Sequence, residues 1–421
     1  MREIFVSKTY ASKSVLITGA TGFLGKVLVE KLLRDCEEID KVYILLRPKK
    51  DESITKRFDD FKSLIVFEIV KRKNPKIFEK LIPIEADLMI SPLAGMSDED
   101  VNKLKKNVSF VFHCAASVKF DDPLKNAIQM NTISTRNMLD LAETFDNLQA
   151  FVHVSTAFSN TNQKEIYEKI YEPIYDYKTI IEIVEGNKID ELAVVNEFAM
   201  QTFPNTYIFS KNLSEKLVSD RSKDLPITIV RPSVVCPSFM EPYPGWVDSM
   251  NGPMGVLIGA SSGFLRTVHG NGNIKPDLIP CDFVVNSLIV AGASVASVEN
   301  KEIKIYNCTS SKQLPISWNE FLQLSQDIYK DYPAMKVIWY PGGRMCSNYY
   351  FYLIYFTIFQ ILPACFIDLC MLLTRKKTWA LKLQKKIFES LKVFEYFLNS
   401  SWEWDNKNFQ ILFKLISLNE R

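Results

Sequence analysis

Short apolar runs and segments of helical periodicity alternate over most of the chain. The runs predict buried strands at 15–17, 42–46, 82–86, 108–113, 150–154, 227–230, 278–280 and 303–307. Between them, apolar residues share one helical face and predict helices at 26–34, 62–80, 131–147 and 207–220, with another helix beginning at 281. Alternating strands and helices are typical of a parallel sheet covered on both faces. We therefore expect an α/β fold, a Rossmann-like doubly wound parallel sheet, with a smaller helical C-terminal domain.

The first predicted strand leads into a glycine turn, Gly19-Ala-Thr-Gly22-Phe-Leu-Gly25, and a helix follows it. In such a unit the first glycine permits the tight turn, the second lets the backbone approach a pyrophosphate, and the third lets helix and strand pack closely. The helix N-terminus then presents free N–H groups and a positive dipole end to the anion. A plain turn is the alternative, which the flanking strand and helix disfavour. The expected cofactor contacts in this turn are Gly19, Thr21, Gly22, Phe23, Leu24 and Gly25.

The second predicted strand ends at Arg47, and Lys49 and Lys50 follow. Units that bind NAD usually carry an acidic residue here, which binds the ribose 2′-hydroxyl. A guanidinium suits the additional 2′-phosphate of NADP, so the sequence favours NADPH; a solvated basic loop is the alternative. Further cofactor contacts are expected after the third and fourth strands, at Asp87, Leu88, Ala115, Ala116 and Ser117.

Composition removes several classes of function. The chain has 421 residues, enough for one large and one smaller domain, and its formal net charge of +2 gives no reason to expect a nucleic-acid partner. Its eight cysteines show no C-x-x-C spacing and its three histidines lie far apart, so we expect a reducing compartment and neither a zinc site nor a disulfide framework. Residues 1–14 are polar and leave no room for a secretory signal peptide. We expect His113 and Cys114, at the end of a buried strand, to be structural.

A tyrosine and a lysine four residues apart, Tyr207 and Lys211, follow the helix-start signal Asn205-Thr206. Positions i and i+4 share one helical face, so the phenol and the ammonium point the same way. The ammonium is expected to lower the pKa of the phenol and make Tyr207 a proton donor near neutral pH. The same spacing recurs at Tyr332 and Lys336, but Pro333 directly follows that tyrosine and the segment lies beyond the sheet.

Two adjacent hydroxyl residues, Ser155 and Thr156, directly follow the fifth predicted strand. Hydroxyls at the carboxyl end of a parallel strand lie where α/β sheets bind ligands. A simple strand-end cap is the alternative.

Several motifs accompany these residues along the chain. They are Leu-Leu-Arg-Pro-Lys (45–49), His-Cys-Ala-Ala-Ser-Val-Lys-Phe (113–120), Val-Ser-Thr-Ala-Phe-Ser-Asn (154–160), Arg-Pro-Ser-Val-Val (231–235), Glu-Pro-Tyr-Pro-Gly-Trp (241–246), Leu-Pro-Ala-Cys-Phe-Ile-Asp (362–368) and Trp-Glu-Trp-Asp-Asn (402–406). Together with the glycine turn and the Tyr–Lys pair, they resemble extended short-chain dehydrogenase/reductases and, more narrowly, the alcohol-forming fatty acyl-CoA reductases. The resemblance covers essentially the whole chain.

The chain departs from that family in three places. The family often has Gly-Lys-Gly near Ser261-Ser262-Gly263 and usually a glycine at Asp51, and similar proteins continue beyond Arg421. We expect an NADP-binding catalytic domain at 12–310, a connecting region at 311–348, and a helical, apolar, membrane-associated domain at 349–421 that is incomplete at its C-terminus.

The resemblance implies an oxidoreductase of lipid biosynthesis. NADPH would reduce the thioester of a long-chain acyl-CoA to a bound aldehyde, and a second NADPH would reduce the aldehyde to the primary alcohol. Tyr207 would protonate the oxyanion, Lys211 would hold the nicotinamide ribose, and Ser155 or Thr156, with preference for Thr156, would donate a second hydrogen bond. We expect substrate contacts from Pro232, Ser233 and Trp246. A homo-oligomer is compatible with the sequence.

The long insertion between Thr156 and Tyr207 is expected to form either a lid over an acyl chain or a surface excursion. It carries four tyrosines among charged residues, Tyr167, Tyr171, Tyr175 and Tyr177.

The apolar segment Tyr349 to Leu373 contains one charged residue, Asp368, and is long enough to cross a bilayer, which needs about 20 residues. Pro363 and Asp368 argue against a simple span, and the lysines and arginines after the segment keep the C-terminus cytosolic. We therefore expect a re-entrant or interfacial hairpin kinked at Pro363, with membrane lipid as a partner and the catalytic domain facing the cytosol at the endoplasmic reticulum or peroxisome. A buried helix that roofs the acyl pocket is the alternative.

Two other functions share some of these features. A sugar-nucleotide epimerase or a hydroxysteroid dehydrogenase would contain the glycine turn and the Tyr–Lys pair, but neither explains the 241–246 loop or the apolar segment. A catalytically silent membrane scaffold that keeps the fold is the third possibility. Product analysis with acyl-CoA distinguishes the three.

Overall fold

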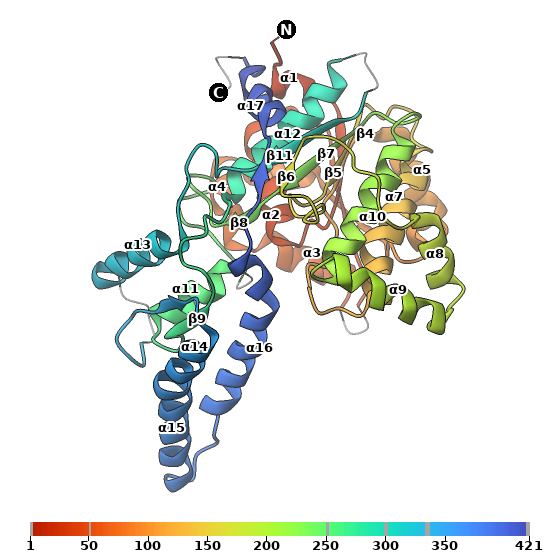
Figure 1. Ribbon diagram of the computed structural model, residues 1–421. Helices are drawn as coiled ribbons and strands as arrows, with labels where there is room; N and C mark the ends of the chain where they lie inside the picture. The colour runs from red at the N-terminus through yellow and green to blue at the C-terminus, as the bar shows by residue number, and fades with distance from the viewer. Residues whose placement is uncertain (1–2, 50–51, 250–251, 299–301, 333–336, 418–421) are drawn as a thin grey trace. The chain divides into compact units, whose positions relative to one another are not determined.

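The computed structural model describes residues 3–49, 52–249, 252–298, 302–332 and 337–417, so the expectations for Lys50, Asp51, Pro333 and Lys336 lie outside the described residues. The chain forms two compact units (Figure 1). The first comprises Met1–Val247, Ile279–Thr309 and Glu403–Arg421, and the second comprises Asp248–Leu278 and Ser310–Trp402.

Both units are discontinuous in sequence, which differs from the contiguous segments 12–310, 311–348 and 349–421 expected above. Asp248–Leu278 leaves the first unit, and Glu403–Arg421 returns to it. The return has a physical cause, because Phe409, Leu412 and Ile416 are buried in the same hydrophobic core as the central strands. Short-range periodicity carries no information about such a distant partner.

A parallel sheet lies at the centre of the first unit, with the strand order β11-β7-β5-β4-β1-β2-β3. Its strands are β1 (Ser14–Thr18), β2 (Val42–Leu46), β3 (Leu81–Glu85), β4 (Val108–His113), β5 (Ala150–Val154), β7 (Ile227–Pro232) and β11 (Lys304–Cys308). Every residue of β1, β2, β4, β5 and β7 is buried, as continuous apolar strands in a doubly covered sheet should be. The order reverses between β1 and β4, and sheets of this kind bind ligands at the carboxyl ends beside such a reversal. The expected doubly wound parallel sheet is confirmed.

Helices cover both faces of this sheet (Figure 1). On one face lie α1 (Val6–Tyr10), α2 (Phe23–Asp35), α12 (Cys281–Ala296) and α17 (Lys407–Lys414), and on the other lie α7 (Ser134–Ala142) and α10 (Thr206–Arg221). Alternate residues of each strand point into the core under α12, as Phe110 and Phe112 of β4 do. Tyr10 of α1 packs against both of these rings. The other elements of this unit are α3 (Ile54–Lys62), α4 (Glu68–Lys73), α5 (Asp98–Asn107), α6 (Leu124–Ala127), β6 (Glu165–Ile166), α8 (Tyr177–Glu185), α9 (Ile189–Thr202), β8 (Val234–Cys236) and β13 (Glu403–Trp404). The short strand β10 (Leu278–Pro280) leads directly into α12.

The single helix expected at 62–80 is wrong. That segment folds as a 3₁₀ turn at Ile65–Phe67, the short helix α4, and a second 3₁₀ segment at Pro75–Lys80. Asn74 is extended, with φ −151° and ψ 93°, because the ring of Pro75 disfavours a helical backbone in the residue before it. The apolar spacing continues across this break, so periodicity alone did not reveal it.

Within the described residues, the second unit contains helices and one pair of parallel strands. Its elements are α11 (Pro253–Ser261), β9 (Thr267–His269), α13 (Trp318–Asp331), β12 (Arg344–Cys346), α14 (Tyr349–Phe356), α15 (Leu362–Leu373) and α16 (Ala380–Asn399). A small core joins β9, α13 and α16 through Val268, Trp318, Leu391 and Leu398.

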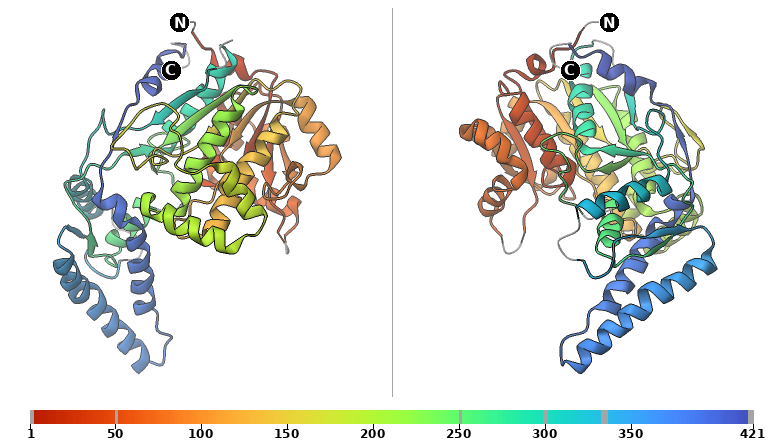
Figure 2. Two further views of the ribbon diagram at one scale, coloured as in Figure 1. Left: turned by 45° about the vertical axis from the view of Figure 1, so that its right-hand side comes forward. Right: turned by 90° about the vertical axis from the view of Figure 1, so that its left-hand side faces the viewer.

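The apolar segment Tyr349–Leu373 is one long helix, in which a π-helical turn at Thr357–Ile361 joins α14 to α15. The chain reverses after Leu373, and α16 runs back beside α15 (Figure 2). The hairpin expected at Pro363 is therefore wrong, because the chain turns only after Leu373. Pro363 lies inside the continuous helix, just after the π-helical turn. Asp368 accepts the backbone N–H groups of residues 379, 380 and 381 at 3.0, 2.9 and 3.1 Å, so this carboxylate caps the start of α16.

Candidate active site

The glycine turn joins β1 to α2, as the sequence predicts. Gly19 has φ +69°, and a Cβ there would lie 2.7 Å from the backbone nitrogen of Ala115. A Cβ on Gly25 would lie 2.2 Å from the carbonyl oxygen of Gly19, so the start of α2 packs against the turn too closely for any side chain. Gly22 is the N-cap residue and places no side chain in front of the free N–H groups of α2. A dinucleotide pyrophosphate fits this arrangement, because it needs an uncovered helix N-terminus.

Two arginines lie together at the carboxyl end of β2. Arg47 is about half exposed, and its Nε lies 3.7 Å from Oδ1 of Asp87, which follows β3. Arg57 of α3 donates a hydrogen bond to the carbonyl oxygen of Arg47. Lys49 is paired with Glu52 at 3.2 Å, so its charge is already compensated. Arg57 also lies 4.0 Å from a carboxylate oxygen of Glu52, so each guanidinium has an acidic neighbour. Guanidinium groups suit a phosphate oxygen better than a ribose hydroxyl.

The loop after β4 is held by hydrogen bonds to its backbone. The Ala115 N–H donates to Oγ1 of Thr18 at 3.1 Å, and the Ser117 N–H donates to Oδ1 of Asn131 at 2.8 Å. Nδ2 of Asn131 donates to the Ser117 carbonyl at 3.1 Å and to Oγ of Ser210 on α10 at 2.9 Å. Asn131 therefore joins the cofactor-side loop to the helix that carries Tyr207, from a π-helical turn at Ile128–Ile133.

His113 and Cys114 are inert at neutral pH. Burial lowers the pKa of His113 to about 3, and its ring nitrogens lie 2.8 Å from Oγ1 of Thr18 and 3.0 Å from Oγ1 of Thr135. Burial raises the pKa of the Cys114 thiol to about 12. Neither group is available for proton transfer near neutral pH, which agrees with the structural role expected from the sequence.

Tyr207 lies in the first turn of α10, which Asn205 caps by accepting the Ile208 N–H at 2.9 Å. Its ring stacks on Phe120 at a centroid distance of 5.6 Å, and its phenol is hydrogen-bonded with the Thr156 hydroxyl. Burial raises the pKa of Tyr207 to about 12, and the contact with Thr156 opposes this by a smaller amount. The expectation of a lowered pKa is therefore wrong, because desolvation of the phenolate decides the sign. The phenol is protonated at neutral pH, which is the form a proton donor needs.

Lys211 is buried one helical turn after Tyr207. Its Nζ donates to the carbonyl oxygen of Val154, the last residue of β5, at 2.8 Å. Burial lowers the pKa of Lys211 to about 8, and the negative charge of Glu215 opposes this effect. The ammonium and the phenol thus share one helical face and both lie at the carboxyl end of β5.

Ser155 points into a buried ion-pair network. Its Oγ donates to Oε1 of Glu215 at 2.5 Å, and Ser159 donates to the same oxygen at 2.9 Å. Arg231 binds both carboxylate oxygens of Glu215, at 2.8 and 2.7 Å. Of the two adjacent hydroxyls, therefore, Thr156 contacts Tyr207 and Ser155 is engaged elsewhere.

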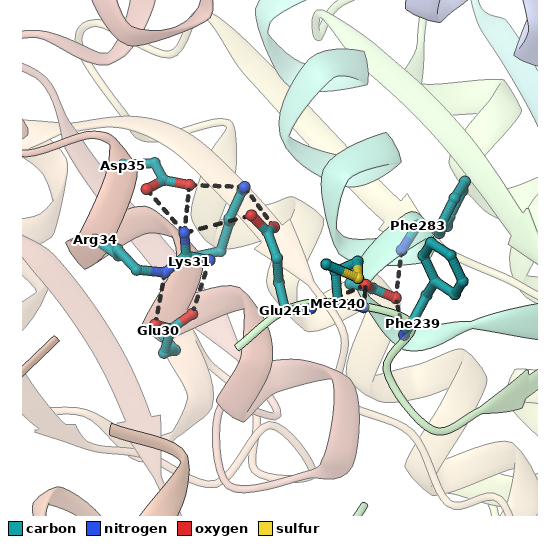
Figure 3. A network of polar contacts seen from close by, with 9 residues as sticks. Glu30, Lys31, Arg34, Asp35, Phe239, Met240, Glu241 and Phe283 are labelled. Atoms are coloured by element: carbon teal, nitrogen blue, oxygen red, sulfur yellow. Dashed lines mark hydrogen bonds and ion pairs between the residues drawn. The ribbon is translucent and has the colours of Figure 1, made fainter. Parts of the chain in front are cut away.

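The loop at 238–246 is held between α12 and α2 (Figure 3). Asp282 of α12 accepts the backbone N–H groups of Phe239, Met240 and Glu241 at 3.0, 2.8 and 3.1 Å. The Glu241 carboxylate pairs with Lys31 of α2 at 2.5 Å. This contact explains why the motif at 241–246 begins with an acidic residue.

The residues expected to contact substrate are buried or engaged through their backbone. Trp246 is 5% exposed and stacks on Phe23, the first residue of α2, at a centroid distance of 5.4 Å. The carbonyl oxygen of Pro232 accepts the Ala157 N–H at 2.9 Å, and the Ser233 N–H donates to the Cys308 carbonyl at 3.1 Å. Their contacts with substrate stay predictions.

Comparison with known proteins agrees with this geometry. Residues 17–288 match the NAD-binding family described as male sterility protein, and residues 359–421 match a second family of that description. Fatty acyl-CoA reductase 1 of Xenopus laevis is 37% identical over 415 residues, which covers 98% of this chain and 80% of the relative. Fatty acyl-CoA reductase 1 of Rattus norvegicus is 36% identical over 412 residues, with coverage of 97% and 79%. Fatty acyl-CoA reductase 2 of Bos taurus is 37% identical over 415 residues, with coverage of 98% and 80%.

The chain belongs to the fatty acyl-CoA reductase family. It is an oxidoreductase with a nicotinamide-dinucleotide-binding domain. The reductase also shares its fold with solved reductase domains. That of a non-ribosomal peptide synthetase from Mycobacterium tuberculosis superposes with a TM-score of 0.62 at 17% identity, covering 97% of this chain and 87% of that one. The terminal reductase domain of the myxalamid pathway gives 0.57 at 22% identity, with coverage of 80% and 72%.

Sequence reasoning missed the residues that hold the reductase's site together. Asn131 was read only as a helix start, and Arg57 and Glu215 were not singled out. Two patterns were available in the sequence. Glu215 follows Lys211 by four residues on the same helical face, and Arg231 directly follows an apolar strand, where a charge needs a buried partner.

Proposed function

We propose that the chain reduces a long-chain fatty acyl-CoA to the primary alcohol and free CoA, with NADPH as the reductant. The observation that carries the proposal is the contact of the protonated Tyr207 phenol with Thr156. It lies at the carboxyl end of the sheet, in a chain whose relatives are named fatty acyl-CoA reductase.

In this reaction bound NADPH supplies a hydride to the thioester carbon. Tyr207 donates its proton to the oxyanion that forms on the carbonyl oxygen, and the Thr156 hydroxyl donates a second hydrogen bond to it. The hemithioacetal would then return its hydroxyl proton to the Tyr207 phenolate and expel the CoA thiolate, which leaves an aldehyde. In the second reduction Tyr207 would protonate the alkoxide, and two solvent protons would restore the phenol and the CoA thiol. Lys211 stays at the end of β5. There its ammonium would hold the ribose hydroxyls and support the charge that develops on Tyr207. The overall balance is two NADPH and two protons consumed for each alcohol and CoA released.

The preference for NADPH rests on Arg47 and Arg57. Both guanidinium groups belong to segments at the carboxyl end of β2, where the ribose of the adenosine half would lie. Asp87 is paired with Arg47, so it does not take the place of the acidic ribose ligand found in NAD units.

The decisive experiment is turnover with palmitoyl-CoA, followed by NADPH oxidation and by chromatography of the product. We expect hexadecanol from the wild type and a loss of kcat of about 100-fold or more in Tyr207→Phe, since a positioned general acid contributes about 10²–10⁴. Tyr177→Phe is the matched control. It removes a phenol that lies away from the site and donates a hydrogen bond of 3.1 Å to Asp220. Undiminished turnover in Tyr207→Phe would remove this residue from the mechanism, and cofactor binding without product would favour the silent scaffold.

We further propose that the long apolar helix lies in the interface of a membrane. Exposure supports this over the alternative of a buried helix, since only 22% of its most apolar 18-residue stretch is buried. Phe366, Leu372 and Leu373 are 67, 63 and 77% exposed.

The partner helix α16 limits how deep this hairpin can go. It exposes four lysines, which a hydrocarbon core would not accept: Lys382, Lys385, Lys386 and Lys392. An orientation along the interface places the apolar helix at the acyl boundary and these lysines among headgroups. After carbonate extraction we expect the wild-type protein in the membrane pellet. The double variant that carries Phe366→Glu and Leu372→Glu should be found in the supernatant. Release of the wild type would contradict the proposal.

A further inference from the structure

The C-terminal segment that belongs to the first unit, Glu403–Arg421, is hydrogen-bonded to the insertion between Thr156 and Tyr207. The strand β13 pairs in parallel with β6, the Glu403 N–H donating to the Lys164 carbonyl and the Asp405 N–H to the Ile166 carbonyl, both at 2.9 Å. Nδ2 of Asn307 in β11 donates to the carbonyls of Ile166 at 3.1 Å and Asp405 at 2.7 Å. The segment is therefore bound to two neighbouring strands before α17 enters the core.

Trp404 is the central residue of this segment. It is 2% exposed, and its indole Nε1 donates a hydrogen bond of 2.9 Å to the carbonyl oxygen of Ala157. Its ring meets Phe158 edge to face at a centroid distance of 5.5 Å. The N–H of Ala157 donates to the Pro232 carbonyl of β7 at 2.9 Å. Both polar groups of the Ala157 backbone are thus fixed, one by the sheet and one by Trp404.

Ala157 directly follows Thr156, the residue whose hydroxyl contacts Tyr207. Oγ1 of Thr156 also accepts the Phe158 N–H at 3.3 Å. This N–H and the Ala157 carbonyl belong to one peptide group, so Trp404 and the Thr156 hydroxyl bind the same peptide. Removing the indole N–H would deprive a buried carbonyl of this donor. The strand-end loop could then rotate that peptide, and the Thr156 hydroxyl would move with it.

We propose that Trp404 is a positioning residue for catalysis: it holds the Ala157–Phe158 peptide so that the Thr156 hydroxyl stays directed at the Tyr207 phenol. The inference rests on the proposed function, because it assigns Thr156 to the oxyanion. It makes Trp404 part of the active-site framework, although this residue lies far from the catalytic residues in sequence.

The test is a double-mutant cycle between Trp404→Phe and Thr156→Val. Phenylalanine keeps a ring against Phe158 and removes only the donor and part of the surface. We expect Trp404→Phe to lower kcat for palmitoyl-CoA about tenfold with KM unchanged, because Thr156 acts on the transition state. In the Thr156→Val background the same change should have no further effect on kcat. Trp402→Phe is the matched control and should keep wild-type kcat, since its ring lies against Tyr396 and Phe397 in the second unit.

Two additional measurements keep the outcome interpretable. If Trp404→Phe does not fold, β-(3-benzothienyl)alanine at position 404 keeps the shape of tryptophan without the N–H and replaces it in the cycle. Hydrogen exchange of residues 155–160 should be faster in either variant and unchanged in Trp402→Phe. The positioning role would be overturned if the fold-losses in kcat of Trp404→Phe and Thr156→Val multiplied in the double variant. It would also be overturned if hydrogen exchange of residues 155–160 stayed at the wild-type rate in Trp404→Phe. A wild type that reduces no acyl-CoA would instead refute the proposed function, while the exchange measurement would still test the contact.

Discussion

Replacing Arg231 by methionine should destabilise the first unit strongly. Arg231 is completely buried and binds both oxygens of Glu215, which is itself 3% exposed. It also donates to the carbonyls of Tyr167 and Lys169 at 3.1 and 3.0 Å. Methionine fills much of the same volume but provides no donor, so the Glu215 carboxylate would keep hydroxyl partners and lose its counter-ion. Removing one member of a buried pair costs about 3–5 kcal/mol, and we expect this range for Arg231→Met.

The measurement is the free energy of urea unfolding for the transition that abolishes cofactor binding, which reports on the first unit. Lys216→Met is the matched control. Lys216 directly follows Glu215 on α10, and its ammonium lies 2.9 Å from the carboxylate of Glu172, which is largely exposed. An exposed pair contributes about 0–1 kcal/mol, so this control should stay close to the wild type.

The double variant Glu215→Gln with Arg231→Met separates a charge effect from a packing effect. A neutral glutamine can still accept hydrogen bonds from Ser155 and Ser159, and it leaves no uncompensated charge. We expect it to be more stable than Arg231→Met alone by about 1–3 kcal/mol, the usual size of coupling within one network. Equal stability of Arg231→Met and Lys216→Met, or a double variant that loses the sum of both single effects, would refute the reasoning.

Three further predictions concern the cofactor side of the site. Gly25→Ala places a Cβ 2.2 Å from the Gly19 carbonyl oxygen, so fluorescence titration should show at least a tenfold loss of NADPH affinity; wild-type affinity would contradict the close packing. Arg47→Asp should lower the ratio of kcat/KM for NADPH to that for NADH by about 100-fold, about 2.7 kcal/mol of charge-assisted contact, and an unchanged ratio would exclude Arg47 from the 2′-phosphate site. Burial lowers the pKa of Lys211 from the ordinary value of 10.5 to about 8, so between these values the unfolded state binds more protons and the contribution of Lys211 to stability rises with pH. The Tm of the wild type should therefore gain on that of Lys211→Met from about pH 8 to 10, whereas a constant difference would contradict the lowered pKa.

The sheet could be predicted from the sequence because its strands are buried on both faces. β2, β4 and β5 begin and end at the expected residues, since continuous apolar runs bounded by polar residues mark such strands directly. The helix expected at 62–80 is wrong because the apolar spacing of this segment persists through the 3₁₀ turn at Ile65–Phe67 and through the break at Asn74, which Pro75 enforces. The return of Glu403–Arg421 to the first unit is a tertiary contact, which local patterning does not contain.

The site could be predicted only as far as its chemistry follows from local spacing. Tyr207 and Lys211 share a helical face, as their separation of four residues requires, and the glycine turn has the expected form. The expected direction of the Tyr207 pKa shift was wrong because the burial of its phenol depends on Phe120 and Thr156, which are distant in sequence. The contacts of Arg57 and Asn131 are likewise set by how neighbouring strands and helices are assembled.

The pair Ser155 and Thr156 shows why two hydroxyls stand side by side after β5. Successive residues of an extended segment point to opposite sides, so one of the two must face the crevice when the other faces the interior. Ser155 donates a hydrogen bond to the buried carboxylate of Glu215, which would otherwise accept one hydrogen bond fewer. Thr156 is hydrogen-bonded with the Tyr207 phenol. Both contacts depend on the same backbone, which Arg231 fixes from one side through Glu215 and which Trp404 fixes through Ala157. If Thr156 acts as proposed, a buried ion pair and a C-terminal indole hold the segment that carries its hydroxyl, and neither is recognisable from the Tyr–Lys motif alone.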